Sequence, residues 1–126
     1  MAIGCGRGAG LVVLFDIESK KEVERVETGT CVNGLLFSKT TKELLTCHGA
    51  PYNQLTLWQC AAGSRLRVVA ELFAHTGPVA QVVLVGSTRV ASLSTDETLR
   101  HWEVFPERKG EEAPKKPPSG KVLSLR

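Results

Sequence analysis

The chain has few aromatic residues and no long hydrophobic run. Aromatic residues make up 6% of the 126 residues, and no apolar stretch approaches the roughly 20 residues that a membrane-spanning helix needs. Residues 1–10 also lack the basic start and apolar core that are typical of a signal peptide. We therefore expect no membrane partner and a location in the cytoplasm and nucleus.

Paired cysteines are also absent. The four cysteines are Cys5, Cys31, Cys47 and Cys60. They are separated by 26, 16 and 13 residues, so none of them forms the C-x-x-C pair of zinc sites and redox motifs. Cys47 and His48 could begin a metal site, but the next candidates, Cys60 and His75, have no recognised spacing. We expect reduced thiols, no metal and no cofactor.

Excess charge of one sign is missing from most of the chain. Residues 1–105 carry ten Lys or Arg and ten Asp or Glu, whereas residues 106–126 carry six and three, which accounts for the net charge of +3. A balanced body argues against nucleic acid as a partner, because nucleic-acid-binding proteins concentrate basic residues on one face. Residues 106–126 are rich in Pro, Lys, Glu and Gly, a composition that predicts a flexible tail.

The sequence does contain a repeat of three apolar runs, each with an aromatic residue near its end. The runs are Leu11–Asp16, Leu55–Gln59 and Leu99–Glu103. Their aromatic residues, Phe15, Trp58 and Trp102, are 43 and 44 residues apart. A period of about 40 to 45 residues with a strand-ending aromatic is typical of WD-type propeller blades.

The segments between these runs alternate in polarity and are separated by Gly or polar residues, as antiparallel strands are. Further strands are predicted at Lys20–Val26, Val32–Phe37, Glu43–Cys47, Arg67–Phe73, Val79–Val85 and Arg89–Ser94. We therefore predict an all-β fold: a partial WD-repeat β-propeller over residues 1–105, with about nine strands in two and a half blades of a presumed seven. Residues 106–126 would form the tail.

Four residues of the third unit can form a hydrogen-bonded chain. They are His75, Ser92, Asp96 and Trp102, with Ser94 as the alternative to Ser92. In WD repeats, which this pattern resembles, such a tetrad holds the strands of one blade together. A hydrolase that uses the Ser, His and Asp is the alternative, but the chain has no G-x-S-x-G elbow and no recognisable oxyanion-hole loop. We expect a structural tetrad and no enzyme.

Alternating glycines near the N-terminus suggest a phosphate-binding loop at first sight. They are Gly4, Gly6, Gly8 and Gly10. A dinucleotide or phosphate loop needs a strand before it and a helix after it, and neither is predicted here. We interpret the glycines as a turn between two blade strands or a frayed end.

Two longer segments resemble a particular family. Lys42–Gly49 reads Lys-Glu-Leu-Leu-Thr-Cys-His-Gly and is followed by Asn53-Gln54-Leu55 and Trp58; Asp96–Arg100 reads Asp-Glu-Thr-Leu-Arg. Together with Val69–Leu72 and His75-Thr76, they resemble the last two blades of Fizzy-type activators of the anaphase-promoting ubiquitin ligase. The resemblance covers roughly residues 5–105. It implies C-terminal blades of a seven-bladed adaptor that recruits degron-bearing substrates for ubiquitination in the cell cycle, with ligase subunits and the remaining blades as partners.

The end of the chain and two internal positions refine this resemblance. Family members dock on the ligase through a C-terminal Ile-Arg, and this chain ends in Leu125-Arg126, which are therefore the candidate partner-binding residues. Family members hold the Lys-Glu-Asn degron with a Gln and an Arg, where this chain has Cys31 and Pro78. Those departures suggest a divergent member or short isoform. The alternative function is a protein-interaction scaffold that has lost ligase activation.

Overall fold

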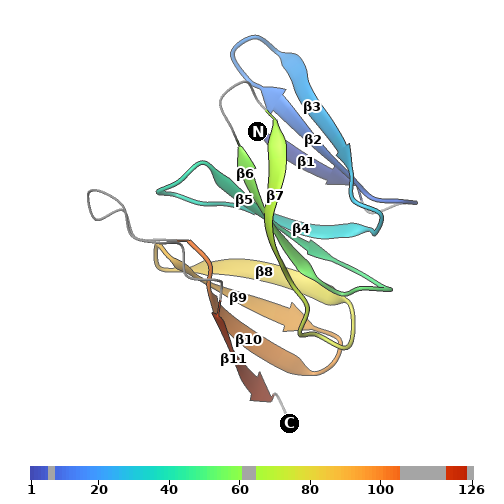
Figure 1. Cartoon of the computed structure of the whole chain (residues 1–126), viewed down its shortest axis with the longest axis vertical. Helices are drawn as coiled ribbons and strands as arrows, with labels where there is room; N and C mark the ends of the chain where they lie inside the picture. Colours follow the sequence, from blue (N-terminus) through green and yellow to red (C-terminus); the bar gives the residue numbers. More distant parts are fainter. Residues whose placement is uncertain (6–7, 61–64, 106–118, 125–126) are drawn as a thin grey trace.

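The computed structural model describes residues 1–5, 8–60, 65–105 and 119–124, and these form eleven β-strands and no helix (Figure 1). The strands are β1 (Ala2–Cys5), β2 (Leu11–Asp16), β3 (Lys21–Glu27), β4 (Val32–Phe37), β5 (Glu43–His48), β6 (Leu55–Cys60), β7 (Leu66–Leu72), β8 (Val79–Val85), β9 (Arg89–Ser94), β10 (Thr98–Glu103) and β11 (Ser119–Ser124). The all-β prediction is confirmed. No helix capable of crossing a membrane occurs in the described ranges.

The strands form three antiparallel sheets that lie one after another (Figure 1). Sheet 1 has the order β1-β2-β3, sheet 2 the order β4-β5-β6-β7, and sheet 3 the order β8-β9-β10-β11. The first strands of sheets 2 and 3 are joined directly, because the Asn33 side-chain amide donates a hydrogen bond to the Val79 carbonyl over 2.8 Å. The first strands of the two four-stranded sheets therefore lie side by side.

Two hydrophobic clusters fill the spaces between the sheets. Val12 and Leu14 of sheet 1 pack in one cluster with Leu44 and Trp58 of sheet 2. The opposite face of sheet 2 packs on sheet 3 in a second cluster, whose buried members are Leu45, Cys47, Leu55, Leu57, Leu72, Val79, Val82, Val90, Trp102, Val104 and Phe105. Full burial of one large apolar side chain contributes about 1.5 to 3 kcal/mol, so these clusters dominate the stability of the arrangement.

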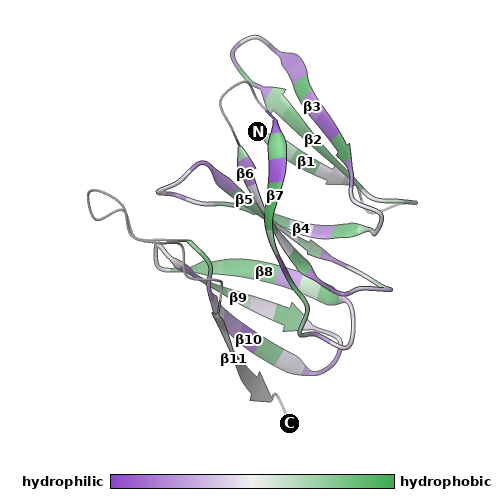
Figure 2. Ribbon diagram, in the orientation of Figure 1, coloured by the Kyte–Doolittle hydropathy of each residue, from purple (hydrophilic) through white to green (hydrophobic). Residues whose placement is uncertain are grey.

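Strand β5 shows why sheet 2 is the centre of the molecule. Every residue of β5 is buried, although a strand with one wet face alternates between buried and exposed residues. The adjacent Leu44 and Leu45 belong to different clusters, so both faces of the strand are covered. Sheets 1 and 3 each pack on sheet 2 with one face. Figure 2 shows the strongly polar strand β3 at the outer side of sheet 1.

Two strands were not predicted, β1 and β11. Strand β11 corrects the prediction of a flexible tail over its six residues, because it pairs with β10 from Thr98↔Ser124 to Glu103↔Ser119. The prolines of this region all lie in residues 106–118, so β11 retains every backbone N–H that a ladder needs. Residues 106–118 lie outside the described part of the chain.

The predicted turn between two strands at the glycine cluster is where β1 and β2 meet. Gly8 and Gly10 have φ angles of +68° and +70°, a region that residues with a Cβ rarely adopt. A Cβ on Gly10 would lie 1.8 Å from the Thr30 carbonyl oxygen, so this glycine also allows sheet 1 to approach the chain before β4. Among the described residues of this segment, a strand follows the glycines, whereas a phosphate-binding loop would lead into a helix.

Candidate functional site

The structure brings the four tetrad residues of sheet 3 into one hydrogen-bonded chain. The Trp102 indole Nε1 donates to the Ser92 Oγ over 2.8 Å, and the same oxygen lies 2.8 Å from His75 Nε2. On the other side of the imidazole ring, His75 Nδ1 lies 3.0 Å from an Asp96 carboxylate oxygen. A carboxylate can only accept hydrogen bonds, so His75 donates to Asp96 from Nδ1 and accepts a hydrogen bond from the Ser92 hydroxyl at Nε2.

The burial and the hydrogen bonds of these groups determine their charge. Burial lowers the pKa of His75 below its ordinary value of 6.5 and outweighs the opposing effect of Asp96. Burial alone would raise the pKa of Asp96, but hydrogen bonds from the Thr98 side chain, the Thr76 backbone and His75 hold it well below 3.8. Near neutral pH the pair is therefore a neutral imidazole that donates to a charged carboxylate.

This arrangement is inconsistent with a hydrolase. The Ser92 residue has no exposed surface, and the side chains of His75 and Asp96 are 0% and 6% exposed. The His75 ring packs edge-to-face on the Trp102 indole, with ring centroids 6.5 Å apart. A nucleophile must face a space in which a substrate carbonyl can lie, and the Ser92 hydroxyl faces an indole and an imidazole instead.

Ser94, the alternative to Ser92, has a different position. Its Oγ donates to the Gly77 carbonyl over 2.8 Å and accepts from the Asp96 backbone N–H over 3.1 Å. Ser94 therefore joins the turn after β9 to the segment before β8, and Ser92 is the one of the two serines that is hydrogen-bonded to the indole.

A second buried chain of polar groups lies in sheet 2, and sequence reasoning missed it. The Trp58 indole Nε1 donates to Thr46 Oγ1 over 2.9 Å, and this hydroxyl lies 2.7 Å from His48 Nε2. His48 Nδ1 in turn lies 3.0 Å from Thr30 Oγ1. The signal was the spacing of Thr46 and His48, because residues two apart on a strand point to the same face.

His48 thus links Thr30 and Thr46 inside the sheet. Burial lowers its pKa below 6.5, and both ring nitrogens have hydroxyl partners. Burial, with a smaller effect of Cys31, raises the pKa of the neighbouring Cys47 to about 12, so its thiol stays protonated. In the described ranges no three His, Cys, Asp or Glu side chains are grouped as a metal ion requires.

The Asn-Gln pair that carries part of the family resemblance shapes the turn between β5 and β6. Asn53 adopts a φ angle of +52°, which Asn tolerates better than most residues, and its N–H donates to the Gly49 carbonyl. The Gln54 carbonyl accepts from the His48 backbone N–H, and both side chains are buried. The pair therefore holds the end of β5 where His48 can reach Thr30 and Thr46.

The two positions that depart from the family pattern occupy equivalent places. Cys31 directly precedes β4 and Pro78 directly precedes β8, at the same end of the two inner strands that the Asn33–Val79 bond joins. The partly exposed Cys31 thiol contacts the Asn33 side-chain oxygen over 3.2 Å. A thiol is a weak donor and proline has no side-chain donor, so neither side chain offers a strong hydrogen-bond donor at this end of the strands.

Leu125 and Arg126 lie outside the described residues. The last described residue, Ser124, pairs with Thr98 at the beginning of β10.

Comparison with known proteins supports the fold and the family resemblance. Cell division cycle 20.6, cofactor of APC complex, from Arabidopsis thaliana is 41% identical over 109 residues, which are 85% of this chain and 24% of that protein. The APC/C activator protein CDH1 of Saccharomyces cerevisiae is 30% identical over 115 residues, 90% of this chain and 20% of that protein. The chain thus spans about a quarter of the length of these curated relatives. No family model matches.

Solved structures agree with this result. A chain in the crystal structure of a mitotic checkpoint complex superposes with a TM-score of 0.70 at 26% identity, over 76% of this chain and 29% of that chain. Sqt1 from Chaetomium thermophilum superposes with a TM-score of 0.62 at 19% identity over 82% of this chain and 27% of that chain, which shows the fold alone. The prediction of a partial WD-repeat propeller is confirmed.

Proposed function

We propose that this chain, a homologue of the Cdc20-, Cdh1- and Fizzy-related activators, is part of a WD-repeat adaptor that brings protein substrates to the anaphase-promoting ubiquitin ligase. The observation that carries the proposal is the 41% identity over 85% of the chain to a relative named as a cofactor of that complex. The adaptor has no catalytic role, in keeping with the buried tetrad, and acts in the cytoplasm and nucleus during cell division.

The proposed contact with the ligase is the C-terminal pair Leu125 and Arg126. A branched aliphatic side chain, a guanidinium and the terminal carboxylate form a compact anchor for a groove with an apolar pocket and matching charges. Such an anchor fits a tetratricopeptide-repeat subunit of the ligase.

The test is binding of a fluorescent peptide with the last residues of the chain to a purified tetratricopeptide-repeat subunit. We expect saturable binding, and loss of at least tenfold in affinity when Arg126 is removed. A peptide with Lys121→Ala, which changes a charge but keeps the terminal pair, serves as the matched control and should bind as the parent does. Equal binding with and without Arg126 would exclude the proposed contact.

A second function, a WD-repeat scaffold that no longer serves the ligase, is favoured by one observation. Cys31 and Pro78 occupy the equivalent ends of neighbouring inner strands, where degron contacts would need strong polar groups. Co-purification of the ligase with the protein that carries this chain separates the two functions. Ligase in the eluate from mitotic cells supports the adaptor, and an eluate without ligase from the same cells supports the scaffold.

A further inference from the structure

The outer strand of sheet 3 is joined to its sheet differently from the outer strands of sheets 1 and 2. Strands β3 and β7 follow their neighbours β2 and β6 after four and five residues, 17–20 and 61–65, whereas fifteen residues, 104–118, separate β10 from β11. A longer connection costs more conformational entropy when its ends are brought together. The pairing of β11 with β10 therefore gains less net stability than a short hairpin would give.

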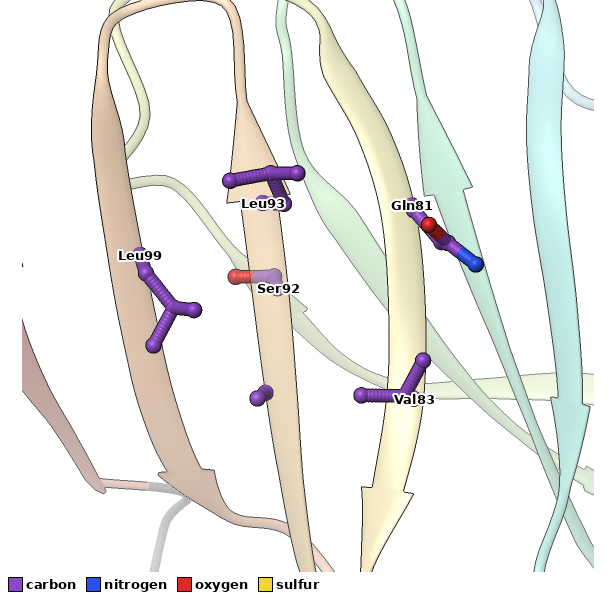
Figure 3. Close-up of a pocket in the computed structure, with 6 residues that line it drawn as sticks. Gln81, Val83, Ser92, Leu93 and Leu99 are labelled. Atoms are coloured by element: carbon purple, nitrogen blue, oxygen red, sulfur yellow. The ribbon is translucent and has the colours of Figure 1, made fainter. Parts of the chain in front are cut away.

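The residues of β11 do little to strengthen this pairing. Strand β10 has β9 on one side, where Leu99 lies beside Leu93 (Figure 3), and β11 on the other. Gly120 and Lys121 of β11 are residue types that are depleted in strands. Gly120 also lies opposite Trp102, where a Cβ would approach the indole to 2.7 Å. A side chain at this position would therefore push β11 away from β10.

Strand β11 leads directly into the proposed contact with the ligase. Its last residue, Ser124, pairs with Thr98 and is followed at once by Leu125 and Arg126. Two residues span at most about 7 Å. A helix with its side chains is about 10 to 12 Å across, so the walls of a groove between helices are deeper than that reach. The backbone before Leu125 must therefore leave the edge of sheet 3 before the pair can lie in such a groove.

We propose that β11 controls access to this contact: the ligase binds Leu125 and Arg126 only in chains whose β11 has separated from β10. The release concerns the same contact as the function proposed above and therefore rests on that function. The apparent association constant of the chain is then that of the free segment multiplied by the fraction of chains in which β11 is released. Completion of sheet 3 and docking on the ligase exclude each other.

The first test compares the intact chain with a peptide of residues 115–126 in binding to the same purified tetratricopeptide-repeat subunit. The peptide has no β10 with which to pair, so we expect it to bind at least about tenfold more tightly than the chain. Equal affinities would overturn the release of β11 and leave the contact itself standing. Absence of binding by both would exclude the contact, and with it both the release and that part of the proposed function.

Gly120→Ala separates strand pairing from recognition by the subunit. In the chain the added Cβ meets Trp102 and releases β11, so the variant should bind at least about fivefold more tightly than the parent chain. In the peptide the same substitution meets no indole and should leave the affinity unchanged, which makes the peptide the matched control. A Gly120→Ala chain that binds as the parent chain does would contradict the proposal.

Ser119→Val shifts the balance in the opposite direction and does not depend on the folding of the Gly120→Ala chain. Valine favours strands, so β11 should stay paired with β10 in a larger fraction of chains. We expect weaker binding by the Ser119→Val chain and unchanged binding by the peptide with the same substitution. Tighter or equal binding by a Ser119→Val chain that is folded by circular dichroism would overturn the proposal.

Hydrogen exchange of the intact chain measures the separation directly. The amides of β10 should exchange faster in the chain bound to the subunit than in the free chain, because β10 loses one of its two neighbours. Strand β6, which lies between β5 and β7, is the internal control, and its exchange should stay unchanged. Unchanged protection of β10 in the bound chain would show that the contact forms with β11 in place and would refute the release.

Discussion

Replacing Ser92 with alanine tests the buried polar chain of sheet 3 most simply. The substitution removes one oxygen atom from a residue without exposed surface and leaves its neighbours in place. That oxygen accepts from the Trp102 indole and donates to His75, so both groups lose their partner at once. Alanine cannot replace either contact.

The expected loss follows from these two orphaned groups. A buried donor or acceptor without a partner costs about 1 to 3 kcal/mol. Two of them give about 2 to 6 kcal/mol, a large part of the roughly 5 to 15 kcal/mol by which domains are usually stable. We therefore expect Ser92→Ala to lower the free energy of unfolding by at least about 2 kcal/mol.

Urea unfolding followed by tryptophan fluorescence measures this loss. Ser87→Ala, in the exposed turn between β8 and β9, makes the same chemical change without burial and should shift the free energy by less than about 0.5 kcal/mol. Equal midpoints for the two variants would refute the assignment of Ser92 as the bridge between the indole and the imidazole.

Three further predictions concern stability. Thr46→Val should cost about 2 kcal/mol or more in the same urea assay, because it orphans the indole and imidazole of sheet 2, and a midpoint within error of the parent would contradict that. Gly10→Ala should destabilise the fold far more than Gly8→Ala. Both glycines have a positive φ, but only at Gly10 would the added Cβ meet a carbonyl oxygen, that of Thr30. Equal thermal midpoints for the two variants would be inconsistent with this packing. The pKa of His75 in the folded chain lies below its ordinary value of 6.5, so its contribution to stability is present above pH 6.5 and is lost as the pH falls through the lowered pKa. The pKa of Asp96 is lowered from 3.8, so its contribution to stability is lost at still lower pH. Unfolding midpoints measured from pH 8 to pH 4 should therefore decrease, and constant midpoints would argue against a buried neutral imidazole.

The order of the sheets could be predicted because the signal is local. Alternation and the 43- and 44-residue spacing of Phe15, Trp58 and Trp102 are properties of consecutive residues. Most of the predicted strands lie within a residue or two of the strands in the structure. The positions of the tetrad residues also followed from that period.

The strands that were missed depend on partners distant in sequence. Strand β1 has only four residues, one of them Gly4, and it exists because β2 pairs with it. Strand β11 follows a Pro- and Lys-rich stretch, and its Gly120 lies so close to Trp102 that a Cβ would approach the indole to 2.7 Å. The composition of residues 106–126 as a whole predicts a tail, and it carries no information on the pairing of six of them with β10. The buried chain of Trp58, Thr46 and His48 was missed for a related reason, since its last member, Thr30, lies in the segment before β4.

Binding of the intact chain to the purified anaphase-promoting complex tests the central claim most directly. Immobilised chain and a variant that lacks Leu125 and Arg126 are exposed to the same complex, and the retained ligase is quantified. The adaptor account predicts retention by the intact chain, and at least a tenfold decrease for the shortened variant. No retention by a chain that is folded by circular dichroism, or equal retention by both chains, would contradict it.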